Sequence, residues 1–289
     1  MGKSNRVNLD DFVHFDPVFA KKLEPFLRGL YDFYFRCEVT GWENIPEGQA
    51  LFVGNHNGLL TFEVLMIFYA WWKRFGTSKK ALALAHGIAL QNPFKWLIPK
   101  LGAVPASPEI ALEALKRNYS LMVYPGGEKE SFRPYKERKK LDFYQRKGFI
   151  RIALQSKVPI VPIVSIGAHE TYFILNRGEK IAEKLGLKKS MRLHGVPITL
   201  RSLFFFWCLT TGIFTFFPLL LAPSALVSIF IPMPAKMKFV ILPAIDVHAM
   251  LDNRLTEEEN IQKIYDYIVT SMQTVLTKEY EKRKYPIIG

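Results

Sequence analysis

The sequence predicts an α/β fold: a mostly parallel sheet flanked by helices, with amphipathic helices at the N-terminus and an apolar, membrane-associated hairpin. Three observations predict it. Short apolar stretches alternate with helical patterns between residues 50 and 165, which is the rhythm of β-α-β units. Apolar residues make up 49% of the chain, enough for a large core. Residues 202–235 contain no charged side chain.

The N-terminal residues 1–35 form the first segment. Asp16 and Pro17 are typical of an N-cap and a first helical position. Apolar residues then recur at helical spacing, and Pro25 predicts a division into two short helices. These helices lie on a membrane surface or pack on the core, and the pattern fits both. We expect residues 36–289 to form the second and larger domain.

Strands and helices follow one another through this larger domain. The predicted strands are residues 36–41, 50–54, 81–85, 119–124, 158–165 and 236–242. The predicted helices are residues 62–75, 93–101, 107–117 and 146–156, and a long helix that the capping box at Thr256 opens. Ligands gather at the carboxyl ends of strands in such sheets.

Residues 202–235 are the most apolar part of the chain. Leu203–Ala222 alone would be long enough to cross a bilayer, but prolines interrupt the segment and aromatic residues crowd one half of it. We expect an insertion that associates with the membrane, either as an interfacial hairpin or as a span through 203–231. A buried core element is the remaining interpretation.

The net charge of +13 favours anionic partners. Residues 128–157 hold ten Lys and Arg against four acidic residues, which suits a phosphorylated substrate, anionic lipid or simply a solvated loop. No nucleic-acid motif accompanies the charge, so we expect no nucleic acid as partner. The two cysteines lie far apart and fit a reducing compartment.

His56 follows the predicted strand 50–54, and Glu63 opens the helix 62–75 seven residues later. A histidine with a carboxylate nearby can act as a general base, because the carboxylate fixes the tautomer and stabilises the imidazolium. A core histidine beside an exposed glutamate would show the same spacing. His56 has no second histidine at metal-ligand spacing, so we expect no metal.

A glycine pair, Gly126 and Gly127, ends the strand 119–124. Paired glycines allow close approach of a ligand to the backbone, although a plain surface turn has the same pattern. Glu128 follows and could accept a hydrogen bond from a substrate hydroxyl or from Arg133. His56 and this turn both lie just beyond strand ends and can face one crevice. The Gly-x-Ser-x-Gly elbow, the phosphate loop and the dinucleotide fingerprint are all absent from the sequence.

Four segments in order resemble the glycerolipid acyltransferase superfamily, within it the branch of the type 2 diacylglycerol acyltransferases and their bacterial relatives. His56 with its carboxylate resembles the His-x4-Asp motif. Residues 101–107 and 124–128 look like the second and third blocks. Residues 146–153, followed by 160–163, resemble the Arg-x-Gly-Phe-x-Lys/Arg-x-Ala...Val-Pro block. The resemblance spans about residues 36–245 and implies that 36–289 is an acyltransferase domain.

Two departures from the family pattern matter. The carboxylate is Glu63 at His+7, whereas the +5 position holds Thr61, which cannot replace an anion. Ser107 stands where the phosphate-acceptor branch tends to carry an arginine, which favours a neutral acceptor such as diacylglycerol.

The resemblance implies a membrane-associated O-acyltransferase that faces the cytoplasm. His56 acts as base and Glu63 as its orienter, while acyl-CoA is a co-substrate, a glycerolipid is the acceptor, and no cofactor is bound. An acyl carrier protein is the other possible donor. The alternatives are a lysophospholipid (1-acylglycerol-3-phosphate) acyltransferase and a catalytically inactive membrane lipid-binding protein. The implied substrate-binding residues are Asn55, Gly126, Gly127, Glu128, Arg133, Arg146, Gly148, Phe149, Arg151 and Pro162.

Overall fold

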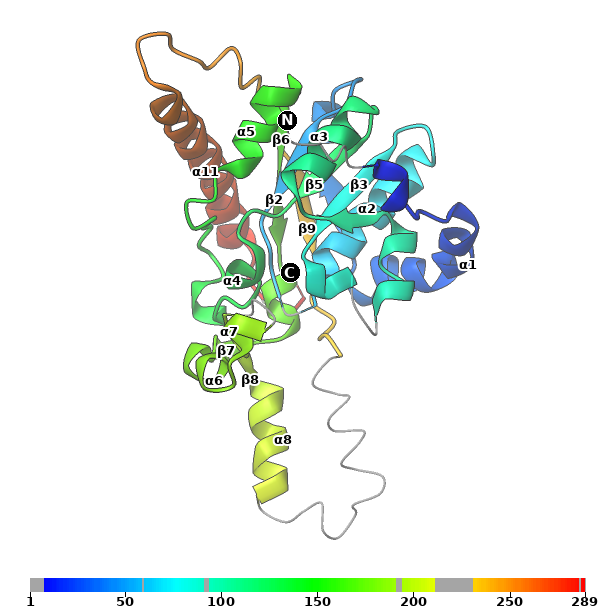
Figure 1. Cartoon of the computed structure of the whole chain (residues 1–289). Helices are drawn as coiled ribbons and strands as arrows, with labels where there is room; N and C mark the ends of the chain where they lie inside the picture. Colours follow the sequence, from blue (N-terminus) through cyan, green and yellow to red (C-terminus); the bar gives the residue numbers. More distant parts are fainter. Residues whose placement is uncertain are drawn as a thin grey trace.

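A central sheet of seven strands forms the middle of the described structure, and helices lie on both of its faces (Figure 1). The computed structural model describes residues 8–58, 60–90, 94–190, 194–210, 231–285 and 287–288. Within them, seven strands pair in the spatial order β1 (Glu38–Thr40), β9 (Lys238–Ile241), β6 (Ile160–Ile166), β2 (Leu51–Gly54), β5 (Ser120–Val123), β3 (Ala81–Ala85) and β4 (Ala103–Pro105).

The sheet is mostly parallel, as predicted. Strands β6, β2, β5, β3 and β4 run in one direction. Strand β9 is antiparallel to β6, and β1 is parallel to β9. The loops that follow β2, β5 and β6 therefore leave the same edge of the sheet as neighbours, because these strands are adjacent and parallel.

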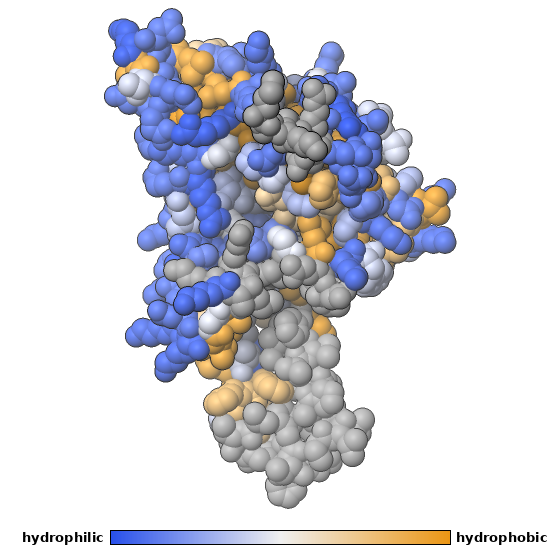
Figure 2. Space-filling model, in the orientation of Figure 1, coloured by the Kyte–Doolittle hydropathy of each residue, from blue (hydrophilic) through white to orange (hydrophobic). Residues whose placement is uncertain are grey.

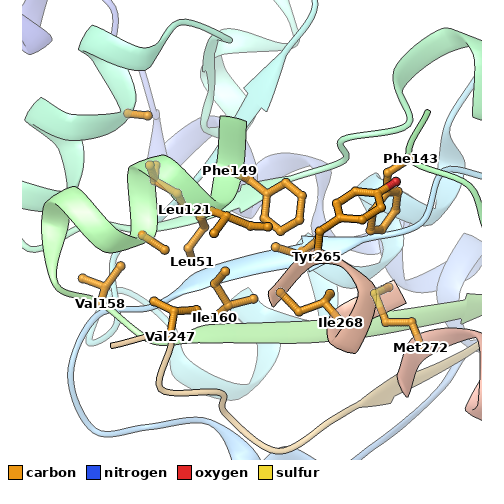
Figure 3. Packing of buried hydrophobic residues seen from close by; sticks show 14 of the residues in the cluster. Leu51, Leu121, Phe143, Phe149, Val158, Ile160, Val247, Tyr265, Ile268 and Met272 are labelled. Atoms are coloured by element: carbon orange, nitrogen blue, oxygen red, sulfur yellow. The ribbon is translucent and has the colours of Figure 1, made fainter. Parts of the chain in front are cut away.

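Helices cover both faces of the sheet. Leu51 and Val53 of β2 belong to one buried cluster, whereas Ala50 and Phe52 belong to the other, which is the alternation of a strand buried on both sides. The first cluster includes residues of α3 (Pro108–Lys116), α5 (Gly148–Ser156) and α11 (Glu257–Lys282), and Figure 3 shows part of it. The second includes residues of α2 (Phe62–Phe75).

The N-terminal helices pack beside α2. Helix α1 (Pro17–Arg28) begins at the predicted N-cap, where the Asp16 side chain accepts the N–H of Phe19. The expected division at Pro25 is wrong. The helix runs through Pro25 to Arg28 and continues as a π-helix, η2 (Gly29–Tyr34). The missing proline N–H costs one hydrogen bond, which packing of the apolar side against the second cluster offsets.

The remaining elements are short. The predicted helix at 93–101 is wrong, because the described part of it forms only two 3-10 turns, η5 (Phe94–Trp96) and η6 (Pro99–Leu101). The other short turns are η1 (Leu9–Asp11), η3 (Trp42–Asn44), η4 (Gly87–Leu90), η7 (Tyr135–Glu137) and η8 (Ala168–Thr171). Helix α4 (Gly127–Ser131) follows β5.

A second small sheet leads into the apolar insertion. Strands β7 (Ile174–Asn176) and β8 (Ile198–Thr199) pair antiparallel, with α6 (Glu179–Lys184) and α7 (Leu187–Ser190) between them. Sequence patterns predicted neither strand, since both are very short. Helix α8 (Leu200–Thr210) then extends away from the body of the molecule (Figure 1).

Only the two ends of the predicted membrane-associated hairpin can be judged. Residues 211–230 lie outside the described residues. Leu203, Phe204, Phe206 and Trp207 of α8 are all exposed, and so is Ile231 at the other end. Figure 2 shows apolar surface over α8. None of the helices formed by described residues is long and apolar enough to span a membrane.

Candidate active site

His56 and Glu63 are in direct contact beyond the carboxyl end of β2. The Nδ1 atom of His56 lies 2.9 Å from Oε1 of Glu63. The Glu63 side chain is fully buried, whereas the His56 side chain retains 16% of its exposure. Because an ionised carboxylate can only accept, Nδ1 carries the proton in this pair and the Nε2 lone pair is left to accept one. This is the arrangement of a general base with an orienting carboxylate.

The loop between them explains how a carboxylate at His+7 reaches the ring. Gly58 and Thr61 both have left-handed backbone, with φ of 90° and 48°. The Thr61 N–H donates to the Gly58 carbonyl over 3.4 Å, and α2 starts at the next residue. Two left-handed residues thus tighten the loop and return Glu63, in the first turn of α2, to His56. Glu63 Oε1 also accepts the N–H of Asn57 at 3.0 Å.

Two asparagines fasten this loop to the neighbouring strand β6. Asn55 Nδ2 donates to the Ser165 carbonyl at 3.0 Å, and its Oδ1 accepts the Ser165 N–H at 2.7 Å. Asn57 Nδ2 donates to the same carbonyl at 2.8 Å. Asn55 is buried and both ends of its amide are bound to β6. Its role in this structure is to hold the loop.

Tyr124 forms one wall of the site. Its ring stacks on the His56 imidazole with centroids 4.4 Å apart and planes 21° from parallel. A side chain at Gly54 would place its Cβ 2.5 Å from Cε1 of Tyr124. Glycine at the end of β2 is therefore needed for the tyrosine to lie against the histidine.

Glu130 was not among the predicted site residues, yet it contacts the histidine. Its Oε2 accepts the backbone N–H of His56 at 2.9 Å. Its Oε1 lies 3.5 Å from Nη2 of Arg133, and both side chains are buried. Burial raises the pKa of Glu130 to about 8, and Arg133 and the His56 N–H act in the opposite direction. Arg133 thus pairs with Glu130 rather than with Glu128.

The glycine pair makes room for side chains of the protein itself. A Cβ on Gly126 would lie 2.1 Å from Oε2 of Glu130, and one on Gly127 would lie 2.5 Å from Nη1 of Arg146. Arg146 donates to the carbonyls of Pro125 and Gly126 at 3.1 and 3.2 Å. The turn is therefore held from both sides.

Glu128 points toward His194, in the segment that leads into the apolar insertion 202–235. Its Oε1 accepts the backbone N–H of His194 at 2.8 Å and also contacts Nδ1 of that histidine. Its Oε2 is buried and has no hydrogen-bond partner among the described residues. The predicted contact with Arg133 is absent there.

Four other predicted residues lie outside this group of contacts. Phe149 of α5 and Pro162 of β6 are both buried in the protein interior. Arg151 is half exposed and pairs with Glu257 and Glu258 at the start of α11, at 2.9 Å from the former. Gly148 is the first residue of α5.

At least half of the ten basic residues in segment 128–157 contact other groups of the protein. Arg133 binds Glu130, Arg146 binds the glycine turn, and Lys147 and Arg151 bind α11. Arg138 lies over the Tyr135 ring, 4.1 Å from its centroid. Lys136, Lys139 and Lys140 remain exposed. At least half of the basic residues for which the sequence suggested a phosphorylated substrate, anionic lipid or solvent therefore contact groups of the protein itself.

Two buried groups lie in η8, directly after β6. His169 is 1% exposed, and neither ring nitrogen has a hydrogen-bond partner among the described residues. Burial lowers its pKa to about 3, with further lowering by Arg133, Arg138 and His56. Glu170 pairs with Arg283, whose Nε lies 3.0 Å from either carboxylate oxygen, and burial raises the pKa of Glu170 to about 7.

The chain at both ends of the apolar insertion 202–235 forms hydrogen bonds to loops beside the candidate site. On the outgoing side, His194 binds Glu128, and the Leu200 N–H donates to the Phe173 carbonyl at 3.4 Å. On the returning side, the Met233 N–H donates to the Thr171 carbonyl at 2.7 Å. The insertion thus leaves from and returns to the same edge of the sheet as His56.

No metal centre is evident within the described ranges, where three or more His, Cys, Asp or Glu side chains nowhere gather as ligands would.

Comparison with known proteins gives the family. Residues 36–166 match the sequence profile of the Acyltransferase family. These residues, just under half of the chain, resemble that family. The match begins just before β1 and ends with β6, so it contains His56, Glu63 and the glycine turn. The predicted superfamily is confirmed.

The curated relatives match part of this chain and part of themselves. An uncharacterized protein of Mycobacterium tuberculosis is 34% identical over 62% of this chain and 51% of its own length. The "DGAT1/2-independent enzyme synthesizing storage lipids" of Gallus gallus is 31% identical over 56% and 47%. The 1-acyl-sn-glycerol-3-phosphate acyltransferase of Cocos nucifera is 28% identical over 53% and 44%. The chain spans about half the length of these relatives.

Among solved structures, the 1-acyl-sn-glycerophosphate acyltransferase of Thermotoga maritima aligns with 88% of this chain and 78% of its own, at 18% identity and a TM-score of 0.48.

Proposed function

We propose that the protein is a membrane-associated glycerolipid O-acyltransferase. It moves a fatty acyl group from acyl-CoA to the hydroxyl of a neutral glycerolipid, with diacylglycerol as the preferred class. The observation that carries the proposal is the His56–Glu63 contact at 2.9 Å, at the strand edge of a region that resembles the Acyltransferase family.

The chemistry follows from the tautomer. His56 Nε2 takes the proton of the acceptor hydroxyl as that oxygen attacks the thioester carbonyl carbon. Glu63 stabilises the imidazolium through Nδ1. The tetrahedral intermediate then collapses, the C–S bond breaks, and the leaving thiolate takes the proton back from His56. The N–H groups of His56 and Asn57 are bound to Glu130 and Glu63, so other donors stabilise the oxyanion.

A neutral acceptor is supported by Ser107. At the position where the phosphate-acceptor branch carries an arginine, this hydroxyl accepts the N–H of Ile110 at 3.2 Å and caps α3. A helix cap supplies no positive charge for an acceptor phosphate. The name of the coconut relative makes a lysophosphatidate the alternative acceptor.

Membrane association is supported by the exposed apolar side chains of α8. Phe204 and Phe206 are 64% and 62% exposed, and both ends of the insertion bind site loops. Aromatic side chains of this kind bind at the lipid interface. A bilayer that holds α8 would supply the lipid acceptor at the edge of the sheet where His56 lies.

An acceptor panel tests the function. Purified protein in mixed micelles receives radiolabelled acyl-CoA with diacylglycerol, monoacylglycerol or lysophosphatidate. We expect transfer to diacylglycerol with at least tenfold higher kcat/KM than to lysophosphatidate. The reverse ranking would reassign the acceptor. The panel is repeated with an acyl-loaded acyl carrier protein as donor, and absence of transfer from either donor to every acceptor would favour an inactive lipid-binding protein.

A further inference from the structure

Helix α4 holds the loop of the histidine at two points. Oε2 of Glu130 accepts the His56 N–H at 2.9 Å, and Oγ of Ser131 donates to the Gly58 carbonyl at 2.5 Å. These contacts join residues 74 and 73 positions apart in sequence. The backbone from His56 to Gly58 is therefore fixed by two consecutive side chains of one short helix.

The space for Glu130 is built into the turn that precedes α4. A Cβ on Gly126 would lie 2.1 Å from Oε2 of Glu130 and 2.5 Å from its Cβ. Glycine at this position is what allows the carboxylate to reach back toward β2. The absence of a side chain at Gly126 is thus explained by Glu130.

The surroundings of Glu130 keep the carboxylate in place. Arg133 approaches Oε1 to 3.5 Å, and the carboxylate is completely buried. Asp142, Tyr265 and His56 are the other titratable groups near it. A buried carboxylate is costly unless its oxygens are paired, and here Arg133 approaches one oxygen while the His56 N–H binds the other.

We propose that Glu130 is a positioning residue for acyl transfer, which holds the His56 backbone so that the imidazole meets the acceptor hydroxyl at reactive distance. The inference rests on the proposed function. Two carboxylates then bind different parts of the same histidine. Glu63 orients its ring, and Glu130 fixes its main chain.

Kinetics of two substitutions test this role. In Glu130→Ala the acceptor of the His56 N–H is lost, and we expect kcat to fall about 10²-fold with KM within about twofold of wild type. Glu130→Gln keeps an acceptor oxygen, and we expect it to recover at least about tenfold of that loss. A rise in KM at unchanged kcat would mean that Glu130 binds substrate and would overturn the proposal.

The matched control is Glu170→Gln. Glu170 is also a buried carboxylate paired with an arginine just beyond a strand of this sheet, but it binds Arg283 and makes no hydrogen bond to His56. We expect it to lower thermal stability while kcat stays within about threefold of wild type. A loss of kcat equal to that of Glu130→Ala would show that any buried ion pair at this edge matters equally, against a specific role for Glu130.

Folding and function are separated by a second readout. Because Glu130→Ala leaves Arg133 buried without its partner, both Glu130 variants are also made in an Arg133→Met background. Amide hydrogen exchange at His56, followed by NMR in detergent, needs no turnover. We expect about tenfold or faster exchange at His56 in Glu130→Ala and near wild-type protection in Glu130→Gln. Unchanged exchange in Glu130→Ala overturns the proposal.

The two proposals fail in different ways. If wild-type protein transfers no acyl group, the proposed function fails, and the exchange measurement alone decides whether Glu130 holds the His56 backbone. If wild type is active but the Glu130 variants are as active, only the positioning role fails.

Discussion

At the scale of single residues, the contact between His56 and Glu63 depends on the backbone of the loop that joins them. His56 stood out because it follows an apolar strand, and Glu63 because it opens a helix. The carboxylate lies at His+7 rather than at His+5, which is a departure from the family motif. Left-handed backbone at Gly58 and Thr61 tightens the loop, so that Glu63 still reaches His56. Threonine rarely adopts this conformation, so the sequence did not predict it.

The Glu63 carboxylate is predicted to act through the imidazole rather than through substrate. In Glu63→Gln the amide can still accept the His56 Nδ1–H but no longer stabilises the imidazolium. We expect kcat to fall about 10²-fold with little change in KM. Steady-state kinetics measure both constants.

Thr61→Val is the comparison for Glu63→Gln, because Thr61 occupies the family's +5 position and its side chain makes no capping hydrogen bond. We expect turnover within about threefold of wild type. A larger loss in Thr61→Val than in Glu63→Gln would show that the dyad is placed wrongly.

His169 predicts a pH dependence of stability. Its pKa is about 3 in the folded protein against 6.5 for a free imidazole. Between about pH 6.5 and about pH 3, the imidazole of His169 is protonated in the unfolded chain but neutral in the folded protein. The free energy of unfolding therefore decreases as the pH falls through this range, by about 1.4 kcal/mol per pH unit.

Urea unfolding at pH 7 and pH 5 of wild type and His169→Leu measures this contribution. We expect wild type to lose about 2 kcal/mol more than the variant between the two pH values. Glu130 and Glu170, whose raised pKa values act with the opposite sign, are present in both proteins and cancel. Equal losses would contradict an unprotonated, buried His169.

At the scale of elements, sequence patterns predicted the long strands and helices well. They failed where a contact between distant segments decides the role of a residue. Counting charges suggested a phosphorylated substrate, anionic lipid or a solvated loop for residues 128–157, yet Arg133 and Arg146 bind Glu130 and the glycine turn. Glu128 and Glu130 are two residues apart on α4, and only the fold separates them, one toward His194 and the other toward His56.

The glycine turn is predicted to be intolerant of any side chain. In Gly126→Ala the new Cβ meets Glu130, and in Gly127→Ala it meets Arg146 at a φ of 54°, where L-residues are strained. We expect each to cost about 1–3 kcal/mol of stability and Gly126→Ala to lower kcat as well. Thermal unfolding and kinetics are the measurements.

Gly29→Ala is the control for the glycine turn, since a Cβ there meets nothing within 4 Å and the backbone φ is −56°. Its stability should match or exceed that of wild type. The account of the turn would be wrong if the three alanine variants behaved alike.

At the scale of the whole molecule, the two ends of the apolar insertion and the candidate active site lie at one edge of the sheet. Composition predicted that residues 202–235 differ from the rest, but not that both ends bind loops of the site. Those bonds join residues dozens of positions apart, and no local pattern encodes them.

The exposed aromatic side chains of α8 are predicted to bind lipid. Phe204→Asp with Phe206→Asp removes two of them, and we expect the fraction of protein that co-sediments with vesicles in 0.5 M salt to fall at least about fivefold. Apolar burial resists salt, whereas attraction to headgroups is screened. Tyr267→Asp with Tyr285→Asp changes two exposed aromatics elsewhere and should leave sedimentation unchanged. Equal behaviour of the two pairs would remove α8 as a membrane contact.

The central claim is that His56 is the base of an acyl transfer, and one measurement tests it most directly. Single-turnover transfer from labelled acyl-CoA to diacylglycerol is compared between wild type and His56→Ala, with both proteins verified as folded by circular dichroism and thermal unfolding. The predicted result is a rate at least about 10²-fold lower in His56→Ala, with sedimentation on vesicles unchanged. Transfer within about tenfold of wild type by a folded His56→Ala protein would contradict the account.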